Sequence, residues 1–329
     1  MEDLEIIDID FKKKNRPSIV DMNGEYLTSK NYITNPAIAR ESEIKKMIIT
    51  LLTPEKSALL VGKPGIGKTA IVEGLAYNIL NGDVPDALKE YKILKINSTA
   101  LVGSMEIDGR EEMVMSVFVD EIKKMTKTII FIDEIHTLIG AKNSGPMDLA
   151  NILKPVIDRG DVKVIGATTS IEYSAYIIRD RAFLRRFEKI EVAEPDEETT
   201  ATILLGSLPK IEKQTGVEFK YKDYVAKQLM DSVVSATSEF KRVYGLSAMY
   251  PDIAFSVLTQ AFSQALFDNR NKVEIIDVYN AIRTSKRIYP DSIVKELEAF
   301  REKFKERLEK ENIDLPVVNI EDIEELQEF

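Results

Sequence analysis

One run of eight residues constrains this chain more than any other feature: Gly-Lys-Pro-Gly-Ile-Gly-Lys-Thr at positions 62–69. Glycine has no Cβ, so its main-chain N–H group can approach an anion closely, and this spacing is typical of a phosphate-binding loop. A short apolar run at 57–61 precedes the loop, and a helical pattern at 69–80 follows it. We therefore expect the loop to join a buried strand to a helix N-terminus, where N–H groups and the helix dipole favour phosphate.

A second motif supplies the acids that hydrolysis of a bound nucleotide requires. The unbroken apolar run at 128–132 suits a central parallel strand covered on both faces, and Asp133 and Glu134 follow it directly. We expect Thr69 and Asp133 to hold Mg²⁺ and Glu134 to polarise the attacking water, while Lys68 reaches the β and γ phosphates of the bound nucleotide. The predicted nucleotide contacts of the loop are Gly62, Lys63, Pro64, Gly65, Ile66, Gly67, Lys68, Thr69 and Ala70.

The pattern of apolar residues predicts two domains with an extension at each end. Between 31 and 193, short apolar runs at 57–61, 92–97, 128–132 and 162–167 alternate with helical periods, which indicates an α/β domain with a parallel sheet sandwiched by helices. From 194 to 287 only helical stretches occur, which predicts a small all-helical domain. Residues 1–30 are expected to be a loosely held extension, although they could also add a strand or dock a partner.

The chain from 288 to 329 forms the other extension. It contains one charged helical stretch at 291–312 and then a short acidic tail. The stretch carries apolar residues three or four apart, which predicts either a strap on the protein body or a contact with another subunit. Those residues are Ile293, Leu297, Phe300, Phe304 and Leu308. The tail is too short to fold alone, so it is either frayed or docked.

The amino-acid composition disfavours several classes of binding partner and metal site. The formal net charge of −10 disfavours a broad nucleic-acid surface, so a protein client is the easier expectation and nucleic acid is only a lesser alternative. The absence of cysteine excludes disulfides and thiolate metal sites, and the one histidine, His136, is expected to bond locally rather than to act as a base. No run of eighteen apolar residues and no secretory leader is present, so we expect a cytoplasmic protein with no membrane insertion.

Several segments together resemble the first ATPase module of Clp-family protein unfoldases and disaggregases, within the AAA+ superfamily. They occur in the family's order and spacing at 35–40, 62–74, 131–140, 151–160, 166–169 and 184–187. The resemblance extends from about 33 to 195 and more weakly to about 287. Its motifs imply an ATP-binding, Mg²⁺-dependent hydrolase of the P-loop class with a helical lid.

The resemblance also implies roles for single residues. It assigns Thr169 to sensing the γ-phosphate, and it makes Arg185 and Arg186 the fingers that a subunit presents to its neighbour's ATP. The implied contacts with the adenine base are Pro36, Ala37, Ile38, Ala39 and Pro251. Because fingers act in trans, the resemblance implies a homo-oligomer, a ring or spiral of six subunits.

The chain departs from the family at the segment that faces the central pore. Where the family has Lys-Tyr-Arg-Gly, this chain has Glu106, Ile107, Asp108 and Gly109, so an aliphatic residue replaces the aromatic one and acids replace the cations. A second departure is Ile253, which stands where the family has lysine, and no second ATPase module is visible.

Two functions therefore remain open. The first is ATP-driven remodelling or unfolding of protein clients, in which the pore segment presses on a threaded chain. The second is a dedicated assembly or loading ATPase that acts on one partner complex without threading, a class that includes ATPases linked to nucleic acid.

Overall fold

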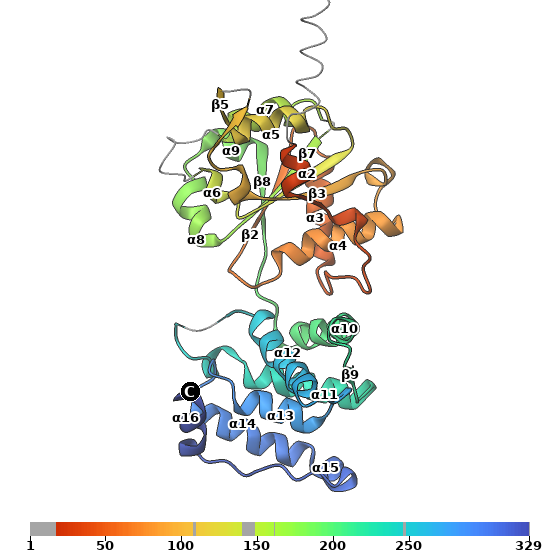
Figure 1. Cartoon of the computed structure of the whole chain (residues 1–329), viewed down its shortest axis with the longest axis vertical. Coiled ribbons are helices and arrows are strands. Elements are labelled where there is room, and N and C mark those ends of the chain that lie inside the picture. Colours follow the sequence, from red (N-terminus) through yellow and green to blue (C-terminus); the bar gives the residue numbers. More distant parts are fainter. Residues whose placement is uncertain (1–17, 108–109, 140–148, 161, 246–247, 329) are drawn as a thin grey trace, which may run out of the picture. The chain divides into compact units, whose positions relative to one another are not determined.

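The computed structural model describes residues 18–107, 110–139, 149–160, 162–245 and 248–328 of the chain (Figure 1). These residues form two compact units. The first, called the sheet unit below, contains the chain up to Asn31, Glu41–Gly62 and Lys68–Val192. The second, the helical unit, contains Tyr32–Arg40, Lys63–Gly67 and the chain from Ala193 onward.

The sheet unit is built on a six-stranded sheet with the order β1-β3-β6-β7-β2-β8. Neighbouring strands are parallel except β1, which is antiparallel to β3. The strands are β1 Gly24–Tyr26, β2 Ser57–Val61, β3 Lys92–Asn97, β6 Thr128–Asp133, β7 Val162–Thr168 and β8 Phe187–Glu191. The four strands expected from the apolar runs are all confirmed, and β6 and β7 each extend one residue further.

Helices cover both faces of this sheet. They are α2 Ile19–Asn23, α3 Glu41–Leu52, α4 Lys68–Asn81, α5 Val114–Ile122, α6 His136–Ile139, α7 Leu149–Ile157, α8 Ser170–Glu172 and α9 Arg181–Arg186. The unit also has the short 3-10 helices η1 Leu27–Ser29, η2 Asp86–Leu88 and η3 Ser98–Leu101 and the π-helix η4 Tyr173–Ile177. Leu59 and Ile130 share a core with residues of α5 and α7. Their strand neighbours Ala58 and Ile129 are also fully buried, and they point to the opposite face because side chains alternate along a strand. The expected α/β architecture is therefore confirmed.

The strand registers determine where the loops of the sheet unit emerge. Val61 at the end of β2 lies opposite Thr168 of β7 and also opposite Glu191 of β8. Asp133 at the end of β6 lies opposite Asn97 of β3. Because these strands are parallel, their carboxyl ends share one edge of the sheet, which is the usual ligand side of such folds. The chain segments that follow β2, β6 and β7 therefore start at the same edge.

Part of the expected N-terminal extension belongs to the sheet unit. Ile19 and Val20 are buried in its core, and the Glu121 carboxylate accepts hydrogen bonds from their main-chain N–H groups at 2.9 and 3.0 Å. The next residues form β1 at the sheet edge. The sequence pattern missed β1 because it is three residues long and lacks an apolar run. Residues 1–17 lie outside the described part of the chain.

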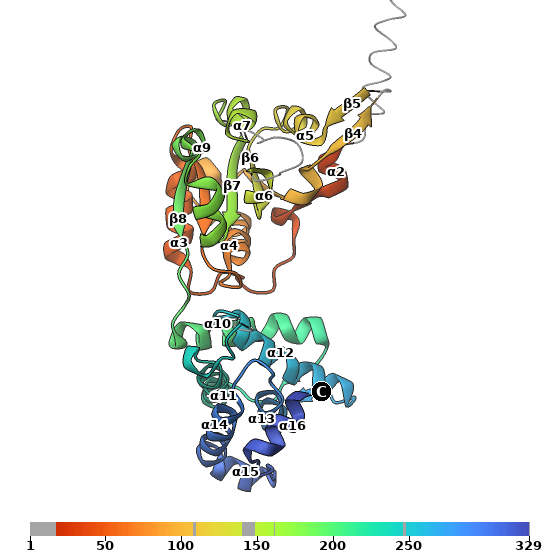
Figure 2. The same cartoon turned by 90° about the vertical axis from the view of Figure 1, so that its left-hand side faces the viewer.

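The sheet unit also carries a hairpin that the sequence pattern did not predict. Strands β4 Ser104–Ile107 and β5 Arg110–Met113 pair in the antiparallel direction and stand out from the rest of the unit (Figure 2). Most of its described side chains are exposed, so no core-facing apolar alternation was available to signal strands.

The helical unit packs its helices around a separate hydrophobic core. They are α10 Glu197–Thr215, α11 Asp223–Ala236, η5 Glu239–Lys241, α12 Asp252–Phe267, α13 Ile275–Arg283, α14 Pro290–Lys303, α15 Lys305–Glu311 and α16 Ile320–Glu328. The expectation of an all-helical unit needs one correction, because β9 Glu218–Phe219 and β10 Lys272–Val273 form a small parallel pair. Two-residue strands are too short to leave a period in the sequence.

The C-terminal extension packs on the helical unit. The five apolar residues expected along one face of 291–312 are all buried, which favours the strap over the subunit contact. The stretch is two helices rather than one, because the chain leaves helical geometry at Phe304. In α16 Ile323 is fully buried, and Gln327 donates to the carbonyl oxygens of Ser285 and Ile288 at 2.9 and 3.0 Å. The tail is therefore docked through the residues described.

Within the described part of the chain, no helix combines the length and apolarity that crossing a bilayer requires.

Candidate functional site

The sheet unit brings the two main sequence motifs into direct contact. Thr69 lies in the first turn of α4, and Asp133 is the last residue of β6. The Thr69 hydroxyl donates a hydrogen bond to Asp133 Oδ2 at 2.9 Å. Two hard oxygen ligands therefore converge at the carboxyl edge of the sheet, as an octahedral divalent cation requires of the protein.

Lys68 lies beside this pair and is only 7% exposed. Its ammonium group donates to the Gly62 carbonyl oxygen at 3.0 Å, which closes the phosphate loop from its first residue to the start of α4. Burial lowers the pKa of Lys68, and the nearby carboxylates of Glu134, Asp133 and Glu172 oppose that shift by Coulomb attraction. A cation held among acids in this way can receive a polyphosphate as its counter-ion.

Glu134 is oriented by its own backbone. Its φ angle of 50° lies in the left-handed region, which is uncommon for a residue other than glycine. Its main-chain N–H donates to Asp133 Oδ1 at 3.1 Å, so both oxygens of Asp133 are used. The Glu134 side chain is half exposed, so water can reach its carboxylate. A general base needs this access to the water from which it takes a proton.

His136 links Glu134 to the neighbouring strand. Its Nδ1 atom lies 3.0 Å from the Thr168 hydroxyl and 3.4 Å from Glu134 Oε2. This agrees with the expectation that His136 makes local bonds. Thr169 follows β7 and is buried, and its hydroxyl accepts from the Glu172 N–H at 3.3 Å to cap α8. The structure thus places Thr169 one residue beyond the strand that contacts His136.

The two candidate arginine fingers differ in their surroundings. Both are in the last turn of α9. The side chain of Arg185 is exposed, while Arg186 is partly buried and donates to the Ala182 carbonyl oxygen at 3.2 Å. Arg185 is therefore the more accessible of the two to a molecule in solution.

In the helical unit, the candidate adenine-binding segment packs closely on α10. Ala37 is buried, and its N–H donates to the Asn35 side-chain oxygen at 2.9 Å. Ile38 lies over Gly206 of α10, where a Cβ on residue 206 would be 2.5 Å from Ile38 Cδ1. A glycine in the middle of a helix is unfavourable, and the close approach of Ile38 explains why glycine occurs at position 206. Ala39 has a left-handed φ of 56°.

The same unit contains the turn of the phosphate loop. Gly65 and Gly67 have φ angles of 76° and 97°, which glycine adopts without strain. A Cβ on Gly65 would be 2.9 Å from Asp252 Cβ, so glycine is also needed there for space. The Lys63 ammonium lies 3.8 Å from Met249 Sδ. Pro251 is buried next to this contact in sequence, and Ile253 is fully buried in the core, which accounts for an apolar residue there.

The donor set fits a magnesium ion that is completed by water and phosphate. Among the described residues no group of three or more His, Cys, Asp or Glu side chains could hold a metal alone. Mg²⁺ keeps several waters and binds through one or two protein oxygens plus substrate phosphates. Thr69 and Asp133 supply such oxygens.

The candidate pore residues fall on the β4–β5 hairpin. Glu106 is exposed and pairs across the hairpin with Glu111, and Ile107 pairs with Arg110. Asp108 and Gly109 lie outside the described residues. The segment is therefore held by strand pairing on both sides of the tip.

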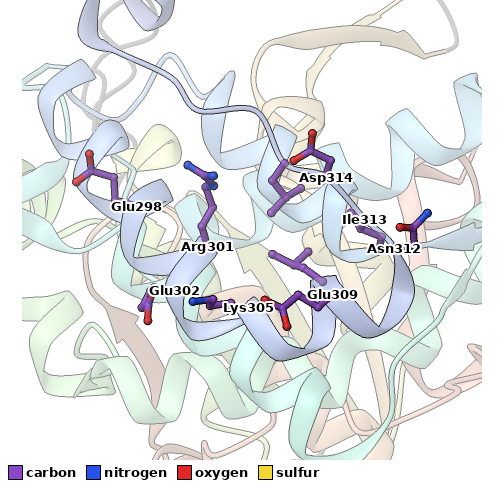
Figure 3. Close-up of a pocket in the computed structure, with 10 residues that line it drawn as sticks. Glu298, Arg301, Glu302, Lys305, Glu309, Asn312, Ile313 and Asp314 are labelled. Carbon is purple, nitrogen blue, oxygen red and sulfur yellow. The ribbon is translucent and has the colours of Figure 1, made fainter.

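A separate pocket of about 660 Å³ lies within the helical unit, between α14, α15 and the chain that returns from them (Figure 3). Charged side chains of both signs line it, among them Arg301, Lys305 and Glu309. It contains none of the residues that the motifs select. Apart from Leu308, Ile313 and Leu315, its lining side chains are polar or charged, whereas a typical cofactor site is lined predominantly by apolar side chains. We assign it no part in nucleotide chemistry.

Three residues near the candidate site were missed or left without a role. Glu172 has a buried Oε2 atom with no hydrogen-bond partner, and its charge acts on Lys68. Gly206 accommodates Ile38, and Arg40 contacts the phosphate loop. Arg40 had a sequence signal, since it ends the 35–40 motif, but Glu172 and Gly206 depend on tertiary contacts that no short pattern contains.

The chain is similar to proteins of known family. The family model described as "ATPase family associated with various cellular activities (AAA)" matches residues 58–194. The "Chaperone protein ClpB" of Bacteroides thetaiotaomicron is 35% identical over 296 residues, which are 89% of this chain and 32% of that protein. The ClpB of Aquifex aeolicus is 39% identical over 244 residues, which are 74% of this chain and 23% of that protein.

Solved structures show the same likeness. A closed-state cryo-EM reconstruction of Hsp104 with ATPγS and FITC casein has a TM-score of 0.69 and 30% identity, over 94% of this chain and 52% of that one. The Saccharomyces cerevisiae Hsp104–ADP complex has a TM-score of 0.67 and 32% identity over the same shares. The chain spans about a third or less of the curated relatives' length and about half of the solved chains.

Proposed function

This chain carries an AAA ATPase module that resembles the first module of the Clp-family chaperones, and from that premise we propose that it is a Mg²⁺-dependent ATPase whose oligomer remodels or unfolds protein clients. The observation that carries the proposal is the 2.9 Å bond between Thr69 and Asp133 beside the buried Lys68. It joins residues far apart in the sequence into the arrangement that phosphoryl transfer uses.

The proposed chemistry follows from the charges and their positions. Lys68 and the main-chain N–H groups of Lys63, Gly65, Ile66 and Gly67 would bind the phosphates. Thr69 and Asp133 would hold Mg²⁺, which would supply positive charge to the phosphate oxygens. Glu134 takes a proton from the attacking water, and its half-exposed carboxylate is free to reach that water. Thr169 senses the γ-phosphate from the end of β7.

We further propose that hydrolysis requires a neighbouring subunit. The exposed Arg185 of one subunit supplies a guanidinium to the neighbour's ATP, with Arg186 supporting it, because transition-state charge spreads over oxygens that such a fork can bind. Oligomers built from this head-to-tail contact close into a ring or continue as a spiral, and six subunits are expected from the family. ATPase activity per chain should then rise with protein concentration.

A substrate trap tests the proposal. Glu134→Gln protein should retain ATP binding, lose turnover, and capture clients from its native lysate in the presence of ATP, where mass spectrometry identifies them. Glu188→Gln, which changes an exposed glutamate on β8, is the matched control. Loss of ATP binding in Glu134→Gln, or unchanged turnover, would contradict the role assigned to Glu134.

The second candidate function, a dedicated assembly or loading ATPase, is supported by the hairpin that carries the altered pore segment. Threading predicts that Ile107→Ala uncouples ATP hydrolysis from client unfolding, because residue 107 would press on the client. Unchanged unfolding of a fluorescent client would favour the assembly function. The trap separates the two further: many unrelated proteins support remodelling, whereas one stoichiometric partner or nuclease-sensitive capture supports assembly.

A further inference from the structure

Arg40 contacts two parts of the helical unit that are distant in sequence. It is only 7% exposed, and its Nη2 donates to the Ile66 carbonyl oxygen at 2.8 Å. Its Nη1 donates to the Ala193 carbonyl oxygen at 3.1 Å. A guanidinium is a rigid planar fork, so these two bonds fix the two carbonyl groups relative to each other.

The bond to Ile66 determines how one peptide of the phosphate loop is turned. In the described chain the single cis peptide is Tyr250–Pro251, so the Ile66–Gly67 peptide is trans. The C=O and N–H bonds of a planar trans peptide point in opposite directions. With the Ile66 oxygen held by Arg40, the Gly67 N–H must point away from Arg40. Donors that are oriented before binding bind a charged group more strongly than donors that must reorient.

The bond to Ala193 connects this peptide to the start of the helical unit's main segment. Ala193 directly follows Val192, whose N–H bonds the Val61 carbonyl oxygen at 2.8 Å within the sheet unit. Next in sequence is Glu194, whose Oε1 accepts from Arg242 at 3.0 Å and from the Tyr250 N–H at 2.8 Å. Arg40 therefore joins the Ile66 carbonyl group, through two hydrogen bonds, to the residue that follows Val192 in the chain.

We propose that Arg40 is a positioning residue that presets the Ile66–Gly67 peptide to receive phosphate and transmits nucleotide occupancy to Ala193. The inference rests on the proposed ATP-binding function of the loop. It assigns Arg40 no contact with the nucleotide.

The test compares Arg40→Met with Arg270→Met. Arg270 belongs to the same unit and bonds the buried Asp277 carboxylate, but not the phosphate loop, so its loss destabilises the unit without touching the loop. With both variants kept well below their melting midpoints, titration with a fluorescent ATP analogue should show about a tenfold to hundredfold weaker affinity for Arg40→Met. Arg270→Met should bind like the unsubstituted protein.

Hydrogen exchange tests the transmission. ATP should slow exchange of peptides covering 193–197 in the unsubstituted protein and in Arg270→Met, but not in Arg40→Met. Arg40→Lys should recover part of the affinity because an ammonium group can still bond one of the two carbonyls.

Two results would overturn the proposal. The first is unchanged affinity in folded Arg40→Met, and the second is an ATP effect on 193–197 that persists in that variant. If the unsubstituted protein itself bound no ATP, the proposed function would fail before Arg40 is tested, so the two failures are distinguishable.

Discussion

The sheet unit contains two acidic regions that are built differently. At the end of β6, both oxygens of Asp133 accept hydrogen bonds and Glu134 lies near His136. On the β4–β5 hairpin, Glu106 is exposed and lies directly opposite Glu111, whose carboxylate accepts a hydrogen bond from the Ser104 hydroxyl of the same hairpin. Opposed like charges destabilise a strand pair, whereas hydrogen-bonded carboxylates are held in one geometry.

Under the proposed function, the two regions would have different tasks, catalysis at β6 and client contact at the hairpin. The region at β6 matches the family's motif, and its geometry is fixed by side chains from three chain segments. The hairpin departs from the family's motif and is held mainly by its own strand pairing. We therefore regard the β6 region as the part that defines the reaction, and the hairpin as the part whose side chains can change with the partner.

The largest effect is expected at the β6 region. Glu134→Gln should lower kcat by about 10² to 10⁴, because an amide cannot accept the proton of the attacking water. The affinity for ATP should change little, since Glu134 is not assigned to phosphate binding. Steady-state phosphate release and equilibrium nucleotide binding measure the two quantities. A similar loss of kcat in Glu188→Gln would contradict the role of Glu134, because an exposed glutamate outside the β6 region would then matter as much.

A smaller effect is expected for the cation that this region surrounds. Lys68→Met should weaken ATP binding by about tenfold to hundredfold, because a hydrogen bond to a charged group contributes about 1.5–3 kcal/mol. The matched control is Lys163→Met, another buried lysine in the same unit, whose pKa is also lowered by burial. Calorimetric titration with an ATP analogue would compare them. Equal losses in both variants would show that burial, rather than position, matters.

The smallest effect is expected on the hairpin. Glu106→Lys replaces a repulsive cross-strand pair by an attractive one and should stabilise the protein by about 0.2–1 kcal/mol. Glu106→Gln removes the repulsion without adding attraction, so its free energy of unfolding should lie between those of the unsubstituted protein and Glu106→Lys. Urea unfolding measures both. A destabilised Glu106→Lys protein would mean that Glu106 has a partner that the register does not reveal.

The sequence predicted the centre of the fold better than its edges. The strands at 57–61 and 92–97 were predicted to the residue. Every residue of 57–61 is buried, and a strand buried on both faces reads as a nearly continuous apolar run. In 92–97 the signal came from the buried Ile93, Leu94 and Ile96. Strand β8 was missed because charged and apolar residues mix in it, and β1 because it is short. Edge strands and hairpins have solvent on at least one side, so they need no such run.

The candidate site likewise has residues that the sequence predicted and contacts that it did not. Lys68, Thr69, Asp133 and Glu134 were chosen from motifs, because their spacing along the chain reflects a strand, a loop and a helix start. The structure brings Lys68, Thr69 and Asp133 together. The hydrogen bonds of Arg40 to Ile66 and Ala193 and the close contact of Gly206 with Ile38 could not be predicted, since each joins separate segments of the chain and depends on tertiary packing.

The position of β2 between β7 and β8 has a consequence for how the protein folds during synthesis. Val61, the residue before the phosphate loop, is paired on both sides with residues that the ribosome adds more than a hundred positions later. Contacts of such long sequence separation form slowly, because loop closure must precede them. The strand that leads into the phosphate loop therefore has both of its neighbouring strands in place only after β8 has emerged from the ribosome and paired.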